Sequence, residues 1–181
     1  MNVITNPSSL NIPATIGMDV ADVDTPSLMV DLDAMEYNVA VMAKFIADNN
    51  IRLRAHAKCH KSYDIAKIQF DAGAIGVCCQ KVSEAESLVN AGCDDVLVSN
   101  QVVAPQKIER LARLAKRARM LVCVDDAGNV EDLSTAATRH GVTLECLVEI
   151  DVGAGRCGVA HGAPVVTLAK AIDAAPGLKF G

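Results

Sequence analysis

The sequence lacks the features that would place it among membrane or nucleic-acid-binding proteins. Its 181 residues carry a formal net charge of −5, and lysines and arginines cluster in only one short motif, which argues against a nucleic-acid partner. No apolar run is long enough to span a membrane, and the amino terminus has no basic region followed by an apolar core. We therefore expect a cytoplasmic protein with no membrane partner that binds small or anionic molecules.

The cysteines do not form the pattern of a disulfide framework. They are odd in number, scattered and mostly inside apolar runs, so a reducing cytoplasm suits them. The seven are Cys59, Cys78, Cys79, Cys93, Cys123, Cys146 and Cys157. The adjacent pair must face opposite sides of a strand, and we interpret both members as small core residues. Neither a Ser-His-Asp order nor a Walker-type loop is present.

What the sequence does contain is an alternation of short apolar runs with amphipathic segments. Residues 1–24 hold two prolines and little periodicity, which predicts an irregular arm. A strand is expected at 27–32, followed by a helix to about Asp48 that an Asp33/Glu36 capping box opens. Further strands are expected at 52–57, 75–79, 95–99, 120–124 and 144–150, with helices at 62–71, 83–91, 105–117, 126–140 and 163–174. The helix at 83–91 has a second box, Ser83 with Glu86, and Lys179 and Phe180 begin a further strand.

This alternation predicts an α/β fold in which helices join parallel strands, as either a barrel or a doubly wound sheet. An eight-stranded barrel takes about 250 residues, and this chain supplies roughly five complete units. We interpret it as an incomplete (β/α)8 barrel of the TIM type, with 1–24 as an arm and 25–181 as the amino-terminal part of the barrel. An unpaired apolar edge favours aggregation, so either the sheet is open by design or the sequence is a fragment.

The segment 54–61 crowds five potentially cationic side chains around Lys58, where a predicted strand ends in a loop. Repulsion disfavours the charged form of an amine, and an uncharged amine is a better nucleophile. Lys58 is therefore a candidate for forming a Schiff base. The alternative is that Lys58 and Lys61 are ordinary solvated lysines and that His56 and His60 only pack.

The carboxyl ends of the predicted parallel strands form the mouth where active sites of such folds lie. Five features of the sequence are expected to meet there: Lys58, Gln80, Asn100, Asp125 and the loop after Asp151.

Two motifs imitate known sites and are better explained otherwise. His56, Cys59 and His60 have side chains that bind zinc, but histidines four apart converge on a helix and the first of these lies in a strand. Residues 153–158 match G-x-G-x-x-G, with Asp173 downstream, yet the dinucleotide fingerprint normally opens its domain and has little bulk where Arg156 stands. We interpret the glycines as freeing the backbone so that Arg156 projects into the mouth and holds an anionic oxygen.

Four motifs, in this order and spacing, resemble one enzyme family. They are TPSLMVDLD at 25–33, HAKCHKS at 56–62, GVCCQKVSEAE at 76–86 and VEIDVGAGRCGV at 148–159. They resemble the D-threonine aldolase and D-serine dehydratase family, and within it the 3-hydroxy-D-aspartate aldolases. The resemblance runs from about Asp22 to Gly181 and implies a fold-type III pyridoxal-phosphate enzyme: a barrel like the alanine racemase amino-terminal domain plus a β domain that residues 27–32 would join.

The resemblance also implies roles for particular residues. Lys58 would hold pyridoxal 5′-phosphate covalently, Arg156 would lie near an oxygen of the cofactor ring, and His56, His60 and Gln80 would line the site. The implied reaction breaks the Cα–Cβ bond of a D-3-hydroxy amino acid, giving glycine and an aldehyde, which is glyoxylate for 3-hydroxy-D-aspartate. Dehydration of D-serine or 3-hydroxyaspartate is the alternative reaction, and a cofactor-binding barrel without turnover is an alternative function.

Relatives use a divalent metal to polarise the hydroxyl group, so the resemblance implies Mg²⁺ or Mn²⁺. The ligands of that metal, the cradle for the cofactor phosphate and the domain that completes a homodimer are expected outside these 181 residues. We accordingly assign no metal ligand within the chain, and we expect the chain alone to have weak or no activity.

Overall fold

The computed structural model describes residues 13–181. The chain divides into two compact units, Met1–Asn38 and Val39–Gly181. In chain order, the elements are η2 (Val20–Asp22), α1 (Leu32–Asp48), β1 (Arg54–His56), α2 (Tyr63–Asp71), β2 (Gly76–Cys79), α3 (Val82–Ala91), β3 (Asp95–Val98), α4 (Pro105–Leu114), β4 (Arg119–Val124), α5 (Ala127–His140), β5 (Leu144–Val148), α6 (Ala163–Ala174) and β6 (Leu178–Phe180). Within the described residues, no helix combines the length and the apolar character needed to cross a lipid bilayer.

The segment before α1 is not a strand, so the prediction of a strand at 27–32 is wrong. Residues 28–31 pair with no other described segment, and the side chains of Leu28, Met29 and Val30 are exposed. A strand needs partners for its backbone N–H and C=O groups, and local β propensity does not replace them.

The caps of α1 and α3 also differ from the predictions. Asp31 caps α1, because its carboxylate accepts a hydrogen bond from the Ala34 N–H at 2.9 Å. At the start of α3, the Glu84 carboxylate accepts from the Lys81 N–H at 3.2 Å. The predicted capping boxes, Asp33 with Glu36 and Ser83 with Glu86, are therefore both wrong.

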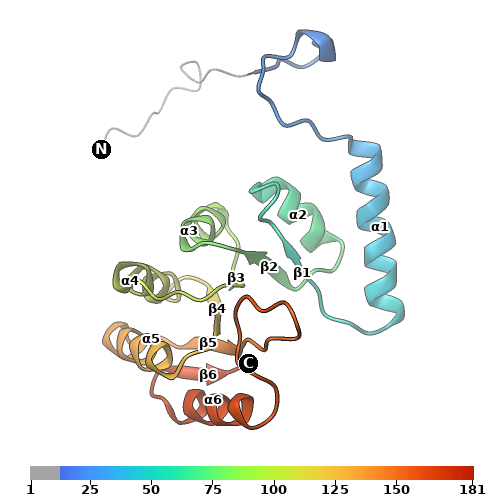
Figure 1. Cartoon of the computed structure of the whole chain (residues 1–181). Helices are drawn as coiled ribbons and strands as arrows, with labels where there is room; N and C mark the ends of the chain where they lie inside the picture. The colour runs from blue at the N-terminus through green and yellow to red at the C-terminus, as the bar shows by residue number, and fades with distance from the viewer. Residues whose placement is uncertain (1–12) are drawn as a thin grey trace, which may run out of the picture. The chain divides into compact units, whose positions relative to one another are not determined.

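The six strands form one parallel sheet in which each strand pairs with the next one along the chain, in the order β1-β2-β3-β4-β5-β6 (Figure 1). A doubly wound sheet reverses its strand order at a switch point, and this sheet has no such reversal. The strand order is that of a barrel, so the predicted α/β fold of the barrel type is confirmed.

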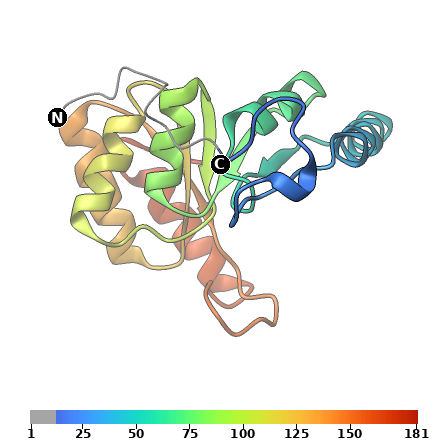
Figure 2. The same ribbon diagram turned by 90° about the horizontal axis from the view of Figure 1, so that it is seen from above.

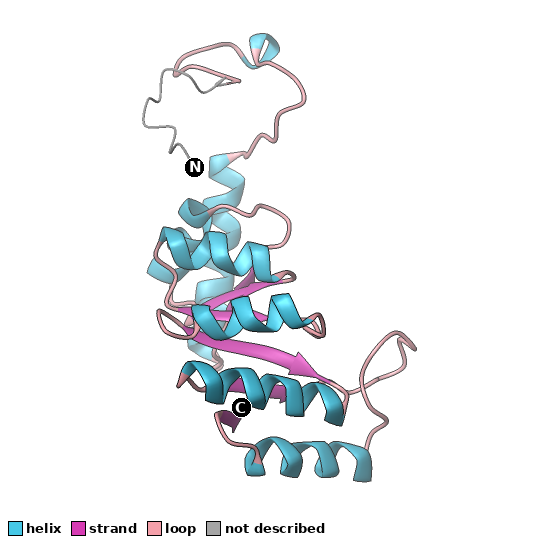
Figure 3. Cartoon of the chain, turned by 90° about the vertical axis from the view of Figure 1, so that its left-hand side faces the viewer, coloured by secondary structure: helices cyan, strands magenta, loops and turns pink. Residues whose placement is uncertain are grey.

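The core lies between the sheet and the helices that cover one of its faces (Figure 3). Side chains alternate along each strand, and those on the helix-covered face are fully buried. They include Val77, Val96, Val98, Met120, Val122 and Leu144. Leu111 of α4, Leu133 of α5 and Ile172 of α6 meet them in the same cluster. Each such side chain contributes about 1.5–3 kcal/mol by leaving water, so this layer dominates the stability of the fold.

Charged side chains link the amino ends of four strands. The guanidinium of Arg54 on β1 donates to both carboxylate oxygens of Asp95 on β3, at 2.7 and 3.0 Å. Arg119 on β4 donates to Asp95 at 2.8 Å and to both oxygens of Glu145 on β5, at 2.6 and 2.9 Å. Glu145 also accepts from Lys179 on β6, at 3.1 Å. We call these five residues the ion-pair ladder.

The ladder passes over β2 because that strand contributes only a glycine to this layer. A Cβ atom on Gly76 would lie 2.5 Å from a carboxylate oxygen of Asp95. The absence of a side chain at Gly76 therefore lets Arg54 reach Asp95 across the intervening strand.

Candidate functional site

Polar side chains gather at the carboxyl ends of the strands. Lys58 lies two residues past β1, while Gln80, Ser99, Asp125 and Glu149 come directly after β2, β3, β4 and β5. The strands are parallel and paired in sequence order, so these residues share one edge of the sheet. The structure thus brings the strand-end residues to one edge, as the sequence predicts.

Lys58 is exposed on a short, anchored turn. The preceding Ala57 is buried and its N–H donates to the Cys78 carbonyl of β2 at 2.7 Å. The Lys61 N–H closes the turn by donating to the Ala57 carbonyl at 2.8 Å. None of the ion pairs in the described part of the chain engages the Lys58 amine. The turn therefore presents a primary amine that no carboxylate occupies.

His56 is held by hydrogen bonds at both ring nitrogens. Its Nδ1 accepts from the Lys58 backbone N–H at 3.2 Å, so Nε2 carries the ring proton. That proton is directed to Ser99 Oγ, 3.3 Å away, and the Ser99 hydroxyl donates to the Cys79 carbonyl at 3.2 Å. The imidazole consequently ties the backbone of Lys58 to the ends of β2 and β3.

His60 repeats the same local contact on the other side of Lys58. Its Nδ1 accepts from the Ser62 N–H at 3.0 Å, and Ser62 in turn caps α2. Burial lowers the pKa of His60, and the nearby His56 lowers it further. Its Nε2 is buried and has no hydrogen-bond partner among the described residues. His60 is therefore a packed, uncharged ring at neutral pH.

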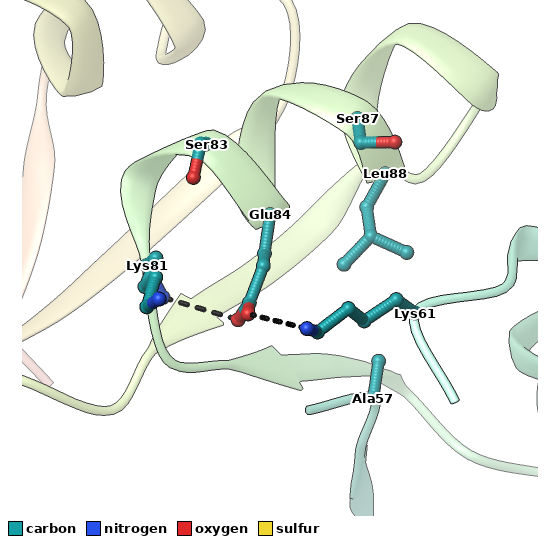
Figure 4. A pocket seen from close by; sticks show the side chains of 7 residues that line it. All are labelled: Ala57, Lys61, Lys81, Ser83, Glu84, Ser87 and Leu88. Atoms are coloured by element: carbon teal, nitrogen blue, oxygen red, sulfur yellow. Dashed lines mark hydrogen bonds and ion pairs between the residues drawn. The ribbon is translucent and has the colours of Figure 1, made fainter. Parts of the chain in front are cut away.

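The predicted crowding of cations around Lys58 is wrong for Arg54. Its guanidinium belongs to the ion-pair ladder at the opposite, amino end of β1. The Lys61 amine is directed to the Glu84 carboxylate at 4.0 Å, as Figure 4 shows. A strand alternates its side chains and has two ends, so neighbours in sequence need not be neighbours in space.

Gln80 bridges the ends of two strands. Its side-chain amide donates to the Ser99 carbonyl at 3.4 Å, and its backbone N–H donates to Glu84 at 2.9 Å. With Asn100 it lines a cleft of about 210 Å³ between the first turns of α3 and α4.

A second cavity, of about 290 Å³, lies beside the turn that carries Lys58 (Figure 4). It is lined by Ala57, Lys61, Lys81, Ser83, Glu84, Ser87 and Leu88. Lys58 is not among the lining residues, so this cavity and the exposed amine are separate features.

Arg156 is carried by the loop between β5 and α6, which projects beyond the strand ends (Figures 2 and 3). The loop returns to its own strand: the Val159 N–H donates to the Glu149 carbonyl and the Asp151 N–H to the Val159 carbonyl, both at 2.9 Å. Three glycines at 153, 155 and 158 have positive φ angles, of 114°, 60° and 99°. They let the backbone make this closed turn with Arg156 exposed on it.

This geometry also argues against a dinucleotide site. In that fingerprint the last glycine leads directly into a helix, whereas here Gly158 precedes a bridge between Ile150 and Val159, and α6 begins only at Ala163. No group of three or more metal-binding side chains converges anywhere in residues 13–181. The thiol of Cys59 is instead hydrogen-bonded to the His56 carbonyl, at 3.9 Å.

Comparisons with known proteins agree with this architecture. Residues 30–181 match the family model described as alanine racemase, N-terminal domain. The chain belongs to this family. It is 52% identical over 172 residues to the 3-hydroxy-D-aspartate aldolase of Paracoccus denitrificans, covering 94% of this chain and 44% of the relative.

Two further members of the family are similar to this chain. The crystal structure of D-threonine aldolase from Filomicrobium marinum superposes with a TM-score of 0.90 at 54% identity, covering 93% of this chain and 45% of that one. The D-threo-3-hydroxyaspartate dehydratase of a Delftia species is 33% identical over 137 residues, which are 75% of this chain and 36% of the relative. The chain spans less than half the length of the relatives it matches.

The structure adds residues to the site of this family member that the sequence analysis missed. Ser99 orients His56, and Glu149 accepts hydrogen bonds from Gln101 at 2.7 Å and from the Cys157 thiol at 2.8 Å. Ser99 and Glu149 each follow a strand directly, and that position is the sequence signal that could have found them. Gln101 has no such signal, because its contact spans 48 residues of chain.

Proposed function

We propose that this chain is the cofactor-binding barrel part of a pyridoxal-phosphate-dependent lyase that cleaves 3-hydroxy-D-aspartate into glycine and glyoxylate. The observation that carries the proposal is the Lys58 amine, exposed at the carboxyl-end edge of the sheet on a turn anchored to β2. The 52% identity to a 3-hydroxy-D-aspartate aldolase supports the choice of substrate.

The side chains at this edge fit pyridoxal phosphate. An aldehyde needs a primary amine to bond with, and Lys58 supplies one that no carboxylate of the described residues neutralises. The anionic oxygens of the cofactor need hydrogen-bond donors, and Arg156 and Gln80 supply a guanidinium and an amide. When bound, the cofactor supplies a conjugated ring that accepts the electrons of the breaking Cα–Cβ bond.

Each residue of the chain has a distinct part in this proposal. Lys58 bonds to the aldehyde carbon, and Arg156, which stays charged at every physiological pH, binds an anionic oxygen. His56 orients the backbone of Lys58, because its Nδ1 accepts from that backbone and its Nε2 is directed to Ser99. With both nitrogens engaged, His56 is a positioning residue and not a base that takes the substrate's proton.

We also infer three properties of the whole protein from the four family motifs: a requirement for Mg²⁺ or Mn²⁺ held by ligands outside this chain, a homodimeric state, and a cytoplasmic location. All seven cysteines are free thiols, which suits a reducing compartment. Activity after chelation and metal return, and light scattering of the whole protein, test the first two.

The proposed activity is tested on the protein that carries this chain. With pyridoxal phosphate and 3-hydroxy-D-aspartate, we expect equal amounts of glycine and glyoxylate, and no turnover in Lys58→Ala. Release of ammonia and oxaloacetate would instead identify a dehydratase. Cofactor absorption that depends on Lys58, with no product from 3-hydroxy-D-aspartate, D-threonine or D-serine, would leave a binding barrel without turnover and would overturn the proposal.

A further inference from the structure

The loop that carries Arg156 is anchored by two carboxylates at the ends of neighbouring strands. Glu149, directly after β5, accepts from the Cys157 thiol with one oxygen at 2.8 Å. Its other oxygen accepts from the side-chain amide of Gln101, in the loop after β3, at 2.7 Å. Glu149 therefore joins the residue after Arg156 to a loop two strands away.

The second anchor is Asp125, directly after β4. Its carboxylate accepts from the backbone N–H of Gly158 at 2.9 Å. Gly158 has a φ of +99°, and a Cβ atom there would lie 2.5 Å from the Asp151 nitrogen. The close approach of Gly158 to Asp151 and its bond to Asp125 thus fix the loop on the side that leads to α6.

A third carboxylate closes the loop on the side of β5. Asp151 accepts from the N–H groups of Gly153, at 2.9 Å, and Gly155, at 3.1 Å. These backbone hydrogen bonds lower the pKa of Asp151, with that from Gly153 the largest cause, so its carboxylate stays ionised and keeps accepting at neutral pH. Arg156 consequently stands between residues that are anchored on both of its sides.

We propose that Asp125 and Glu149 are positioning residues that fix the Arg156 guanidinium at the carboxyl-end edge of the sheet, where it binds an anionic oxygen of the cofactor. The inference deepens the proposed function and rests on it for the identity of the ligand. The anchoring itself belongs to the cofactor-free chain. Neither carboxylate needs to touch the cofactor, since both act through the loop backbone and through Cys157.

The first experiment measures amide hydrogen exchange across residues 151–159 without cofactor. Asp125→Ala removes the acceptor of the Gly158 N–H, and we expect exchange there to become about tenfold faster or more. Asp125→Asn keeps an acceptor oxygen and should restore most of the protection. Asp173→Ala, the same change at an exposed position of α6, is the matched control and should leave exchange in this loop unchanged.

The second experiment measures pyridoxal phosphate binding in a double-mutant cycle. Asp125→Ala and Arg156→Ala should each weaken binding several-fold, and the double variant should bind no more weakly than Arg156→Ala alone, because Asp125 acts through Arg156. Glu149→Gln, which keeps only one of the two acceptor oxygens, should give a smaller loss with the same dependence on Arg156.

The outcomes separate this inference from the proposed function. Unchanged exchange in Asp125→Ala would overturn the anchoring. Faster exchange with additive losses in the cycle would overturn the action through Arg156. If the chain gives no cofactor absorption that Lys58→Ala removes, the proposed function fails, and the exchange experiment still decides whether the carboxylates hold the loop.

Discussion

The two ends of the sheet use charged side chains in opposite ways. At the amino ends, the five residues of the ion-pair ladder neutralise one another across the strands. At the carboxyl ends, the carboxylates of Asp125, Glu149 and Asp151 accept hydrogen bonds from backbone amides, one side-chain amide and one thiol. The cations Lys58 and Arg156 at that end have no carboxylate partner among the described residues.

This difference teaches which end is built for stability and which for binding. Paired charges hold strands in register but present little to a ligand. Cations whose carboxylate neighbours are already engaged elsewhere can bind an anionic ligand without first breaking an ion pair. Substitutions at the amino end should therefore change the free energy of unfolding, and those at the carboxyl end should change ligand binding.

The largest expected effect is that of Arg119→Ala at the amino end. It removes the shared partner of Asp95 and Glu145, whose side chains are only 13% and 10% exposed. We expect the free energy of unfolding, measured with urea, to fall by about 2–3 kcal/mol. The loss stays at or below the range for an unpaired buried charge because Arg54 and Lys179 remain as partners.

The control for Arg119→Ala is Lys67→Ala, which removes a pair with Asp71 that is exposed on the surface of α2. Exposed pairs of this kind contribute little, so the change should stay below about 0.5 kcal/mol. Equal losses in the two variants would contradict the assignment of the amino end to stability.

Acid should weaken the ladder next. The guanidinium of Arg119, and then the amine of Lys179, hold the pKa of Glu145 at about 2, below its ordinary value of 4.5. Because the folded-state pKa is the lower one, this stabilisation is complete above about pH 4.5 and is lost as the pH falls toward 2. We expect a loss on the order of 2 kcal/mol in that window. The Glu145→Gln variant should lack this part of the pH dependence; an unchanged profile would show that other groups cause it.

Gly158→Ala should produce a smaller effect, confined to the carboxyl end. An added Cβ would collide with the backbone of Asp151, and the φ of +99° is strained for alanine. We expect about tenfold weaker binding of pyridoxal phosphate, equivalent to about 1.4 kcal/mol. The urea midpoint should move little, because the loop lies outside the core. A large fall in the midpoint would instead make the loop part of the stabilising framework.

Ser99→Ala should have the smallest effect of the four. His56 Nε2 loses its partner, at a net cost of about 1 kcal/mol or less in holding the ring. Nitrogen chemical shifts of the imidazole should report a changed mixture of tautomers, and Ser87→Ala, at an exposed serine of α3, should not alter them. Identical shifts in wild type and Ser99→Ala would remove Ser99 from the site.

The elements that the sequence predicted well are those with a local cause. Strands such as β2 and β5 consist of apolar residues on both faces, and the helices between them have clear amphipathic patterns, so both were found to within a few residues. The segment at 27–32 has a similar apolar pattern but no partner strand among the described residues, and its β propensity therefore misled the prediction.

The contacts that the sequence could not reveal are those between distant residues. Arg54 meets Asp95 across 41 residues and Gln101 meets Glu149 across 48, and no local pattern encodes either pair. The predicted neighbours of Lys58 illustrate the same limit, because sequence proximity placed Arg54 beside it and strand geometry carries that guanidinium to the other end of β1. Strand ends, in contrast, were a reliable guide to where polar residues meet.

The most direct test of the central claim is to find which amine of the chain bonds to the cofactor. The protein is incubated with pyridoxal phosphate, reduced with borohydride and digested, and the modified peptide is identified by mass spectrometry. The account predicts modification at Lys58 at a stoichiometry near one, with Lys61 and Lys67 unmodified. Modification spread over exposed lysines, or undiminished in Lys58→Ala, would contradict it.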